Sequence, residues 1–560
     1  MHKSSISFYS LGLLLALSLG LNLYGIQWGL PNGVEDWAND SLAPLGPLVY
    51  AKRTLSHEFW SSKYPPVHFM TLALVYVPYI LYLYLTGGLT TPSDVYPYGL
   101  ADPATSLMIL TLIARVTSAV MGTATVWVTY ITVNRLYGHR AGWCAAFLLA
   151  ASYAVIYYSH NANIDVPQLF WTSLALYNLV VLRQTYATRH YVGLGIFSAL
   201  AIGTKDSMLA LVAGLGLALL YCHFRHEREA GHRVLTTLVH RKLLYGVIAF
   251  AVTLILALNL PWHWEGFAEH VEHHLDASVK GHIIAGPPAR AKHGDVSRLL
   301  DCVVYLMQTS GLPAFLLGLG GVGYCLIKRP ATGWPLLLLP VSYYLFFLRI
   351  HATVHLRYLL PVYLLLTWPA GKLAADLLDA KGVVKWLATA LLVLIFGYTL
   401  VYGFSVNWLM IHDSRYTAET WMARHIPSQA VIVAVGPAYG LSRFPVGLHV
   451  HHVHVRLLEE QGRKQFQQQL QALQPDYVML NVSHPVRVQH KTTLYQWLRN
   501  QGYDIVTSFQ SAIPFWGAAH FHAVNPELVI FARCLRRNDS LPGPVGSSTA
   551  YRRTCAEPSF

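Results

Sequence analysis

Long apolar runs alternate with short polar segments between residues 6 and 404. A helix of about 20 predominantly apolar residues can cross the hydrocarbon layer of a membrane. The pattern therefore predicts an α-helical polytopic membrane protein with about eleven spans. The predicted spans are 6–24, 106–133, 141–158, 166–182, 191–203, 207–222, 243–262, 304–327, 333–348, 358–378 and 384–404.

Basic residues mark every second loop between these runs. The positive-inside rule assigns such loops to the cytoplasm. It places the N-terminus there and makes residues 6–24 a retained first span. The basic positions are Arg135, Arg140, Arg183, Arg189, Arg225, Arg228, Arg233, Arg241, Lys242, Lys328, Arg329, Lys381 and Lys385. The outer face then receives 25–105, 159–165, 204–206, 263–303, 349–357 and everything after 405.

Two apolar segments do not fit simple crossings. Residues 67–86 begin and end on the outer side by this parity, which predicts a surface-lying or re-entrant helix; an ordinary span is the alternative. The segments 191–203 and 207–222 are only roughly 20 and 24 Å long as helices, against a slab of about 30 Å. The tip between them, Gly203-Thr-Lys-Asp-Ser207, should lie below the outer surface. A Lys–Asp pair at that depth, Lys205 with Asp206, is a candidate functional site, and a mutually neutralised structural pair is the alternative.

The pattern changes after residue 405. Helical periodicity is predicted over 413–427, 456–473 and 495–500, and buried strands over 430–435, 477–480 and 528–533. This alternation favours a small extracytoplasmic α/β domain over 405–537. Residues 538–560 are rich in Ser, Pro and Gly and are expected to be a disordered tail. Residues 1–404 form the predicted membrane domain, with its first outer loop at 25–66.

Composition supports the membrane class and excludes others. Of the 560 residues, 54% are hydrophobic and only 12% charged, about half the charged fraction of a soluble protein. The net charge of +13 does not indicate nucleic-acid binding, because Lys and Arg lie mostly in short loops, where they also meet anionic membrane lipids. Six scattered Cys argue against a redox motif or zinc site. Cys534 and Cys555 can pair if their domain is extracytoplasmic; two free thiols are the alternative.

The outer face collects the side chains that sugar transfer at a membrane requires. A carboxylate must accept the proton of the attacking hydroxyl, and cations must stabilise a departing phosphate. The segment 349–357 places four cationic or potentially cationic groups outside, where the charge rule does not require them; interfacial snorkelling is the structural alternative. The acidic candidates are Glu35, Asp36, Asp40 and Asp165. The basic candidates are Lys63, Arg115, Lys205, Arg349, His351, His355 and Arg357.

The outer loop 263–303 is rich in histidine. His270 with His273 or His274 has the i,i+3 or i,i+4 spacing of metal ligands on a helix. A wet amphipathic helix at the interface explains the same spacing. No cofactor is indicated with certainty, and a divalent metal stays open.

Several short motifs resemble a known family in their order and spacing. They are the acidic first loop, Lys63-Tyr-Pro-Pro66, Arg115, Tyr137-Gly-His-Arg-Ala-Gly142, Tyr158-Ser-His-Asn-Ala-Asn-Ile-Asp-Val-Pro167, Gly203-Thr-Lys205 and Arg357-Tyr-Leu-Leu-Pro361. Over residues 1–430 the chain resembles the bacterial branch of the protein O-mannosyltransferase-like family. These are C-type (GT-C) membrane glycosyltransferases that include the aminoarabinose transferase of lipid A.

The resemblance implies a polyprenyl-phosphate sugar donor, transfer on the outer face of the cell membrane, and inversion at the anomeric carbon. It implies that a first-loop acid is the base, that Lys63 and Arg357 face the lipid phosphate, and that Asp165 lines the site. We add Lys205, Arg349, His355 and Arg115 as phosphate-binding candidates, and Tyr64 and Asp206 as lining candidates.

One departure from the family concerns the base. The family usually has an Asp-Glu pair in this loop, where this chain has Asn39-Asp40-Ser41. Asp40 is the predicted base, with Asp36 and then Glu35 in reserve; a chain that has lost activity is an alternative. A transporter or flippase, and a non-catalytic assembly subunit, are the other hypotheses. The acceptor stays open among protein hydroxyls, lipid A, teichoic-type polymers and envelope polysaccharide.

Overall fold

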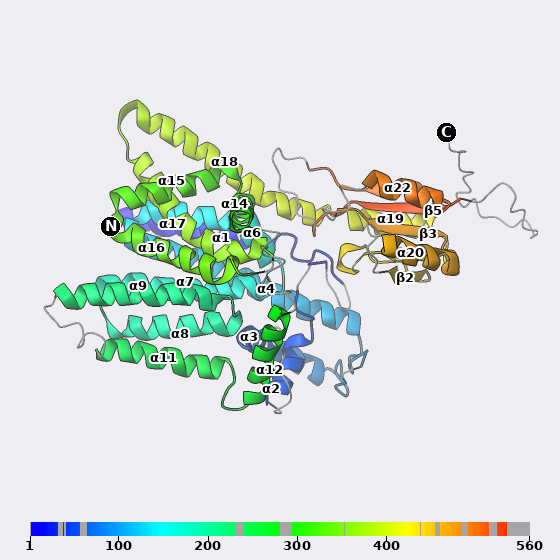
Figure 1. Ribbon diagram of the computed structural model, residues 1–560, viewed down its shortest axis with the longest axis horizontal. Helices are drawn as coiled ribbons and strands as arrows, with labels where there is room; N and C mark the ends of the chain where they lie inside the picture. The colour runs from blue at the N-terminus through cyan, green and yellow to red at the C-terminus, as the bar shows by residue number, and fades with distance from the viewer. Residues whose placement is uncertain are drawn as a thin grey trace, which may run out of the picture. The chain divides into compact units, whose positions relative to one another are not determined.

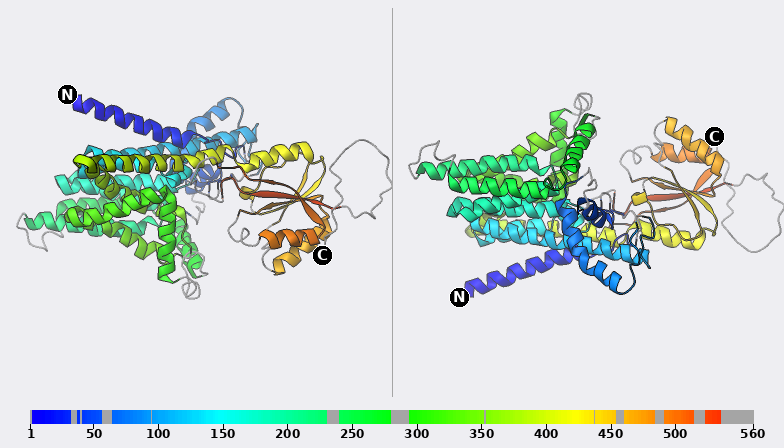
Figure 2. Two further views of the ribbon diagram at one scale, coloured as in Figure 1. Left: turned by 90° about the horizontal axis from the view of Figure 1, so that it is seen from above. Right: turned by 90° about the horizontal axis from the view of Figure 1, so that it is seen from below.

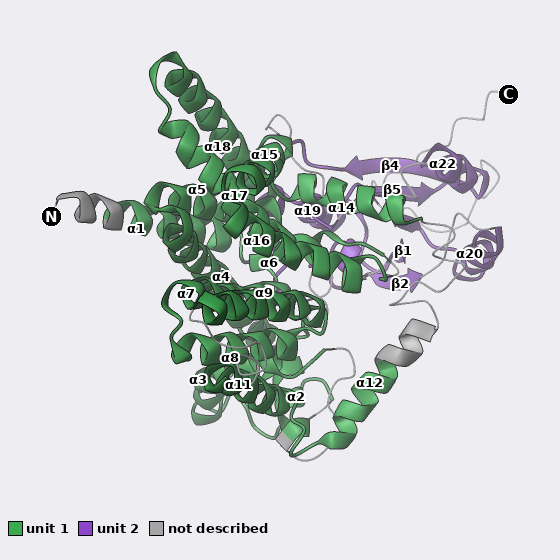
Figure 3. Cartoon of the chain, turned by 60° about the vertical axis from the view of Figure 1, so that its left-hand side comes forward, with its two compact units in different colours: residues 1–26, 42–407 green, residues 27–41, 408–560 purple. Residues whose placement is uncertain are grey.

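The chain divides into two compact units in a computed structural model (Figure 3). Unit 1 comprises residues 1–26 and 42–407, and unit 2 comprises residues 27–41 and 408–560. Part of the first outer loop therefore belongs to the same unit as the C-terminal region. The structure describes residues 2–31, 37–38, 41–55, 64–93, 95–229, 240–279, 294–351, 353–436, 438–453, 460–483, 491–513 and 523–534.

Unit 1 is helical (Figure 1). Its longer helices are α1 (His2–Leu23), α3 (Val67–Leu85), α4 (Pro103–Tyr137), α7 (Asp165–Thr185), α8 (Thr188–Thr204), α9 (Met208–Glu229), α11 (Arg241–Ala257), α15 (Leu312–Lys328), α16 (Pro330–Tyr343), α17 (Leu360–Leu378) and α18 (Gly382–Ile411). Shorter ones are α2 (Gly46–Leu55), α5 (His139–Ala150), α6 (Tyr153–Ser159), α12 (Trp264–Val279), α14 (Asp295–Ser310) and the 3₁₀ turn η2 (Leu356–Leu359). The division between the units falls within α18.

The helices of unit 1 have the length and hydropathy of a multi-pass membrane protein. Among the described residues, five helices are long and apolar enough to cross a membrane, or up to seven if each bent pair is one span. The helix α3 is one of the five, and whether it crosses the membrane or lies at its surface stays a prediction. The predicted polytopic helical class is confirmed, and the span number of about eleven stays a prediction.

Two predicted spans are bent in the structure. The span predicted over 141–158 consists of α5 and α6, which meet at 60°, and that predicted over 304–327 is divided into α14 and α15, which meet at 116°. A continuous span over 304–327 is therefore wrong. The break lies at Gly311, whose φ of +82° is readily adopted only by glycine.

The helices α7, α8 and α11 pack side by side (Figure 1). A Cβ atom on Gly195 of α8 would lie 2.4 Å from the carbonyl oxygen of Gly246 in α11. Only glycine permits so close a backbone approach, as is common between membrane helices. The predicted tip between 191–203 and 207–222 lies where α8 ends at Thr204 and α9 begins at Met208. This packing fixes the position of Lys205.

Unit 2 contains a five-stranded sheet in the order β2-β1-β3-β5-β4. Its strands are β1 (Val431–Val435), β2 (His449–Val453), β3 (Tyr477–Asn481), β4 (Tyr503–Phe509) and β5 (Leu528–Arg533). β1 is parallel to β2 and β3, whereas β5 is antiparallel to β3 and β4. The predicted α/β character is confirmed, but β2 and β4 were not among the predicted strands. The histidine-rich sequence of β2 hides its strand pattern.

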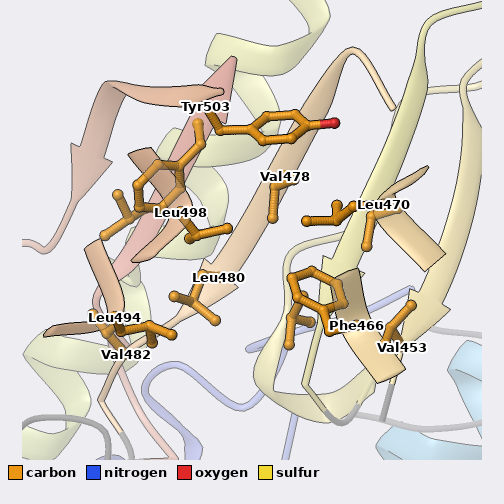
Figure 4. Close-up of a cluster of buried hydrophobic side chains, with 13 residues drawn as sticks. Val453, Phe466, Leu470, Val478, Leu480, Val482, Leu494, Leu498 and Tyr503 are labelled. Atoms are coloured by element: carbon orange, nitrogen blue, oxygen red, sulfur yellow. The ribbon is translucent and has the colours of Figure 1, made fainter. Parts of the chain in front are cut away.

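Helices cover both faces of this sheet (Figure 2). On one face, Phe466 and Leu470 of α20 (Glu460–Leu473) and Leu494 and Leu498 of α22 (Lys491–Asn500) pack on the sheet around Val478 (Figure 4). On the other face, α19 (Ser414–His425) packs against β1, β3 and β5. The result is a three-layer α/β domain whose core is continuous on both sides of β1 and β3.

Cysteine pairing agrees with one of the two alternatives. Cys534 is disulfide-bonded, whereas the described cysteines of unit 1 are free. Its predicted partner, Cys555, lies outside the described residues.

Candidate functional site

A buried ion pair joins the start of α7 to the end of α8. The ammonium of Lys205 lies 2.5 Å from Oδ1 of Asp165, and their side chains are 10% and 4% exposed. Asp165 is the first residue of α7, and Lys205 follows α8 with extended backbone. A carboxylate is stabilised by the dipole at a helix N-terminus, and here it also meets a cation. Charged groups so deeply buried in a membrane protein indicate a functional site.

This pairing corrects the prediction made for the tip. Lys205 pairs with Asp165 and not with Asp206, which contacts His270 of α12 through a 3.1 Å separation of Oδ1 and Nε2. Neighbouring residues in an extended or turning chain project in different directions, so adjacency in sequence did not make a pair. Asp206 is also more exposed, at 41% of its side chain.

Aromatic and cationic groups of η2 complete one side of this pair. The Tyr358 ring has Lys205 Nζ at 5.0 Å from its centroid and the Arg357 guanidinium carbon at 5.3 Å. Cations are attracted to the face of an aromatic ring at such distances. Three of the predicted phosphate-binding residues, Lys205, His355 and Arg357, therefore lie around one tyrosine. Sequence reasoning missed Tyr358, although it stands inside the quoted motif at 357–361.

Buried amides lie in the loop that leads to Asp165. Asn161 is fully buried, and among the described residues neither its Oδ1 nor its Nδ2 has a hydrogen-bond partner. Asn163 accepts a hydrogen bond from the backbone N–H of Asp165 at 3.1 Å, but its Nδ2 has no partner within the described part of the chain. A buried polar group without a partner costs about 1–3 kcal/mol. A polar ligand at this position would recover that cost.

A second aromatic group, centred on Tyr50, lies near Asp206. The hydroxyl of Tyr50 in α2 donates to the carbonyl of Tyr64 at 3.2 Å, and its ring stacks on Phe69 of α3 at 4.3 Å between centroids. Burial raises the pKa of Tyr50, and the negative charge of Asp206 adds to the effect. Tyr50 therefore stays a neutral phenol. The predicted lining residues Tyr64 and Asp206 lie near this ring, while Lys63 lies outside the described residues.

The cationic segment 349–357 divides into separate roles. Arg349 forms a two-point ion pair with Asp295 on the exposed surface, with separations of 3.2 and 2.8 Å. His355 Nε2 lies 3.0 Å from the Thr353 hydroxyl and is exposed. Burial is the main cause that lowers the pKa of His351 to about 4, so its ring is neutral at pH 7. His351, His355 and Arg357 all contact the Tyr358 ring that Lys205 faces, with the two imidazole centroids 4.9 and 5.2 Å from that of the tyrosine.

Arg115 contacts the chain just after α1. It is fully buried within α4, and its Nη1 donates to the carbonyl of Ile26 at 2.6 Å. In the same region, Nε2 of His160 lies 2.9 Å from the carbonyl oxygen of Tyr24. Arg115 therefore fixes the end of the first span in unit 1. Its predicted role in binding phosphate stays a prediction.

The predicted bases Asp40, Asp36 and Glu35 lie outside the described residues. Trp37 of the same segment is described and fully buried in unit 2. The guanidinium carbons of Arg415 and Arg443 lie 4.2 and 5.2 Å from its ring. The indole is thus stabilised by two cation–π contacts. Trp37 is therefore firmly held within unit 2.

Further contacts hold the same segment. The indole N–H of Trp28 donates to Asp413 Oδ2 at 3.0 Å, and the backbone N–H of Gly29 donates to the Tyr416 hydroxyl at 2.9 Å. Burial raises the pKa of Tyr416, which keeps this hydroxyl neutral. Arg443 also donates to the carbonyl of Pro31 at 3.0 Å. Residues 28–31 and 37 are therefore integral to unit 2.

The arrangement in unit 1 suits an anionic ligand with polar substituents. It offers two cations, an aromatic ring, a carboxylate and unsatisfied amides, all placed by the ends of α7 and α8 and by η2. The predicted metal pair of His270 with His273 or His274 stays a prediction: His273 is exposed, and the side chain of His274 lies outside the described residues. His270 itself contacts Asp206.

Part of the chain matches a known family. Residues 103–258 match the family described as dolichyl-phosphate-mannose-protein mannosyltransferase. This region includes Arg115, Asp165 and Lys205. The resemblance predicted from the sequence motifs is confirmed. No curated protein matches the chain.

Several solved structures of membrane glycosyltransferases are similar to the chain. ArnT from Cupriavidus metallidurans bound to undecaprenyl phosphate is 14% identical, with a TM-score of 0.45 and coverage of 95% of this chain and 99% of that one. The Archaeoglobus fulgidus oligosaccharyltransferase is 11% identical, with a TM-score of 0.43 and coverage of 87% and 69%. The Saccharomyces cerevisiae Pmt1-Pmt2 complex bound to its sugar donor is 17% identical, with a TM-score of 0.33 and coverage of 50% and 34%.

Proposed function

We propose that the chain, part of which matches the protein mannosyltransferases, is a multi-pass membrane glycosyltransferase of the GT-C type that moves a sugar from a polyprenyl-phosphate donor to an acceptor hydroxyl. The matched family is named for a dolichyl-phosphate-linked mannose, which supports a lipid-phosphate donor here. The observation that carries the proposal is the buried Asp165–Lys205 pair beside Tyr358 and Arg357. Such a group suits a sugar phosphate at a membrane surface.

The two cations act on the leaving group. In the reaction, the bond between the anomeric carbon and the phosphate oxygen breaks, and a bond to the acceptor oxygen forms. Negative charge develops on the departing polyprenyl phosphate, and Lys205 and Arg357 stabilise it. Asp165 holds the Lys205 ammonium in place through the 2.5 Å contact. Charge stabilisation of this kind commonly contributes about a hundredfold or more to a rate.

An acid of the first loop acts as the base. Asp40 accepts the proton of the acceptor hydroxyl as the new bond forms, and attack from the face opposite the phosphate inverts the anomeric carbon. Trp37 stands three positions before Asp40 and directly after Asp36. Its burial in unit 2 supports a role for unit 2 in positioning the base.

The reaction takes place on the extracytoplasmic face of the cell membrane, with the N-terminus in the cytoplasm. The basic loops support this orientation. The disulfide at Cys534 supports an oxidising compartment for unit 2. Unit 2, on the same extracytoplasmic side, contributes to acceptor choice.

Transfer of labelled sugar from a set of polyprenyl-phosphate sugars tests the function. Purified wild-type protein in detergent should release polyprenyl phosphate and transfer the labelled sugar to an acceptor, or to water as free sugar. The Asp40→Asn variant should release none. Asp36→Asn and Glu35→Gln are matched controls that should retain it. Retained release in Asp40→Asn with loss in Asp36→Asn or Glu35→Gln would move the base to that residue.

Failure of every donor would overturn the proposal when a range of acceptors is supplied. Movement of intact donor across a vesicle membrane without release would indicate a flippase. Donor binding without release or movement would indicate a non-catalytic subunit.

A further inference from the structure

Three potential metal ligands lie together near the far end of α9, away from Lys205. They are His223 and Glu227 of α9 and His240, which caps the start of α11. One ligand atom from each lies within 4.8 Å of the other two. His223 is fully buried, Glu227 is 3% exposed, and His240 is about a quarter exposed in its side chain.

The position separates this cluster from the candidate catalytic site. His223 lies fifteen residues after Met208, where α9 begins, which is about 22 Å along a helix. The basic loops place this end of the helices on the cytoplasmic side. The cluster has no part in the sugar transfer proposed above.

The separation between His240 and Glu227 exceeds a hydrogen bond and suits a bound ion. His240 Nε2 and Glu227 Oε1 are 3.9 Å apart, too far for a hydrogen bond. Ligand bonds of about 2.0–2.2 Å place neighbouring ligand atoms roughly 3.3–4 Å apart around a metal ion. His223 and Glu227 are four residues apart on one helix, so both project from the same face.

Tyrosines surround the cluster as a second layer. The hydroxyls of Tyr186 and Tyr191 lie 2.8 and 2.7 Å from Nδ1 of His223. Tyr186 also donates to Glu227. Hydrogen bonds of this kind fix the ring orientation and tautomer of a metal-binding histidine. Lys242 donates to the Tyr186 carbonyl at 3.0 Å, so its ammonium already has an acceptor outside the three ligands.

We propose that His223, Glu227 and His240 bind one transition-metal ion of the zinc type. Two imidazoles and one carboxylate favour such an ion over Mg²⁺ or Ca²⁺, which prefer oxygen ligands. The bound ion links the end of α9 to the start of α11. Because α11 packs along α8, and α8 carries Lys205 at its other end, this link stabilises the helices that hold the candidate site.

Metal binding by the purified full-length protein tests the proposal. After removal of the affinity tag and of metal by a chelator, wild type should take up one zinc ion in competition with a chromophoric chelator and should bind Mg²⁺ far more weakly. His240→Ala and Glu227→Gln should each weaken zinc binding by at least about tenfold.

The matched control is His226→Ala. His226 lies on the same helix and stacks on Tyr186 at 3.7 Å between ring centroids, but it is not one of the three grouped ligands. It should keep wild-type zinc affinity, and zinc should raise its melting temperature as it does that of wild type.

Two results would overturn the site: no zinc uptake by wild type at micromolar metal, or equal uptake by wild type and His240→Ala. If the ligand variants do not fold, Co²⁺ spectra of wild type decide. Intense visible absorption indicates a four-coordinate site with protein ligands, and the weak spectrum of hydrated Co²⁺ overturns the proposal. These readouts need no sugar donor, so failure here leaves the proposed transferase untouched.

Discussion

Two buried ion pairs, one in each unit, differ in the groups that surround them. In unit 2, Arg415 meets Asp413 at two points, with separations of 2.8 and 2.7 Å. Arg415 also donates to the carbonyls of Tyr439 and Ala523, and Asp413 accepts from Trp28 and from a backbone N–H. Both side chains are 0% exposed. The polar groups of this pair are hydrogen-bonded to several other groups of the protein.

In unit 1, Asp165 and Lys205 meet at one point. Their surroundings include the amide of Asn161, which has no partner among the described residues, and the face of Tyr358. A pair whose neighbours are all bonded within the protein leaves little for a ligand, whereas a partnerless amide near a pair would be completed by one. We infer a structural role for the first pair and propose a binding role for the second.

The largest expected effect is on stability, from Arg415→Met. The change leaves Asp413 buried without its cation, which typically costs about 3–5 kcal/mol. Unit 2 should lose resistance to thermal unfolding and to protease. The control is Lys464→Met, whose exposed pair with Glu460 in α20 should contribute at most about 1 kcal/mol. Equal melting temperatures for the two variants would remove the distinction between the pairs.

Lys205→Met should instead act on turnover. Loss of one charge that stabilises the leaving phosphate should lower the transfer rate by about 100- to 1000-fold. Lys372→Met is a matched control, because Lys372 is equally buried and pairs with Asp376 at 2.6 Å within α17. Rates are compared per folded molecule. If the transfer rate per folded molecule is the same for Lys205→Met, Lys372→Met and wild type, the Asp165–Lys205 pair has a structural role as well.

Trp37→Phe should have a smaller effect on the same reaction. The substitution keeps an aromatic ring but weakens its contacts with Arg415 and Arg443, each worth about 0.5–1 kcal/mol or more when buried. We expect kcat to fall about fivefold, with the KM for donor unchanged, because the donor contacts lie in unit 1. Trp386→Ala, at a highly exposed position, should leave both constants unchanged. A rise in KM at constant kcat would contradict a positioning role.

The smallest effect concerns pH and His351. Its folded pKa of about 4 lies below the unfolded value of about 6.5, so the folded state binds fewer protons in between. The contribution of this ring to stability is therefore present above pH 6.5 and is lost as the pH falls towards 4. Melting temperatures of His351→Gln measured across this window should fall less than those of wild type. Parallel profiles would contradict the assignment.

Local patterns predicted the site residues better than their partners. Asp165 and Lys205 stood in separate motifs, and both were candidates before the structure was known. Their pairing depends on α7 and α8 ending at the same level, which no local pattern contains. The prediction that paired Lys205 with Asp206 used sequence adjacency, and the extended backbone at Lys205 defeats it.

Helices and strands with a strong apolar pattern were predicted correctly, and those with a weak pattern were missed. Apolar runs predicted the long helices and the three central strands. The sharp bend at Gly311 was missed, because both sides of it are apolar and a single glycine is tolerated in many helices. β2 was missed because a strand with three histidines lacks the usual alternation of apolar positions. Tyr358 was missed because a tyrosine among apolar residues has no distinctive pattern until its neighbours are known.

The membership of residues 27–41 in unit 2 has a consequence for building hybrids from this chain and its relatives. A graft that exchanges only the sequence after residue 407 would separate Trp28 and Trp37 from the arginines and the aspartate that they contact. Both grafted partners would carry half of a shared core. A working exchange of unit 2 must therefore transfer two segments, the short one near the N-terminus together with the C-terminal one.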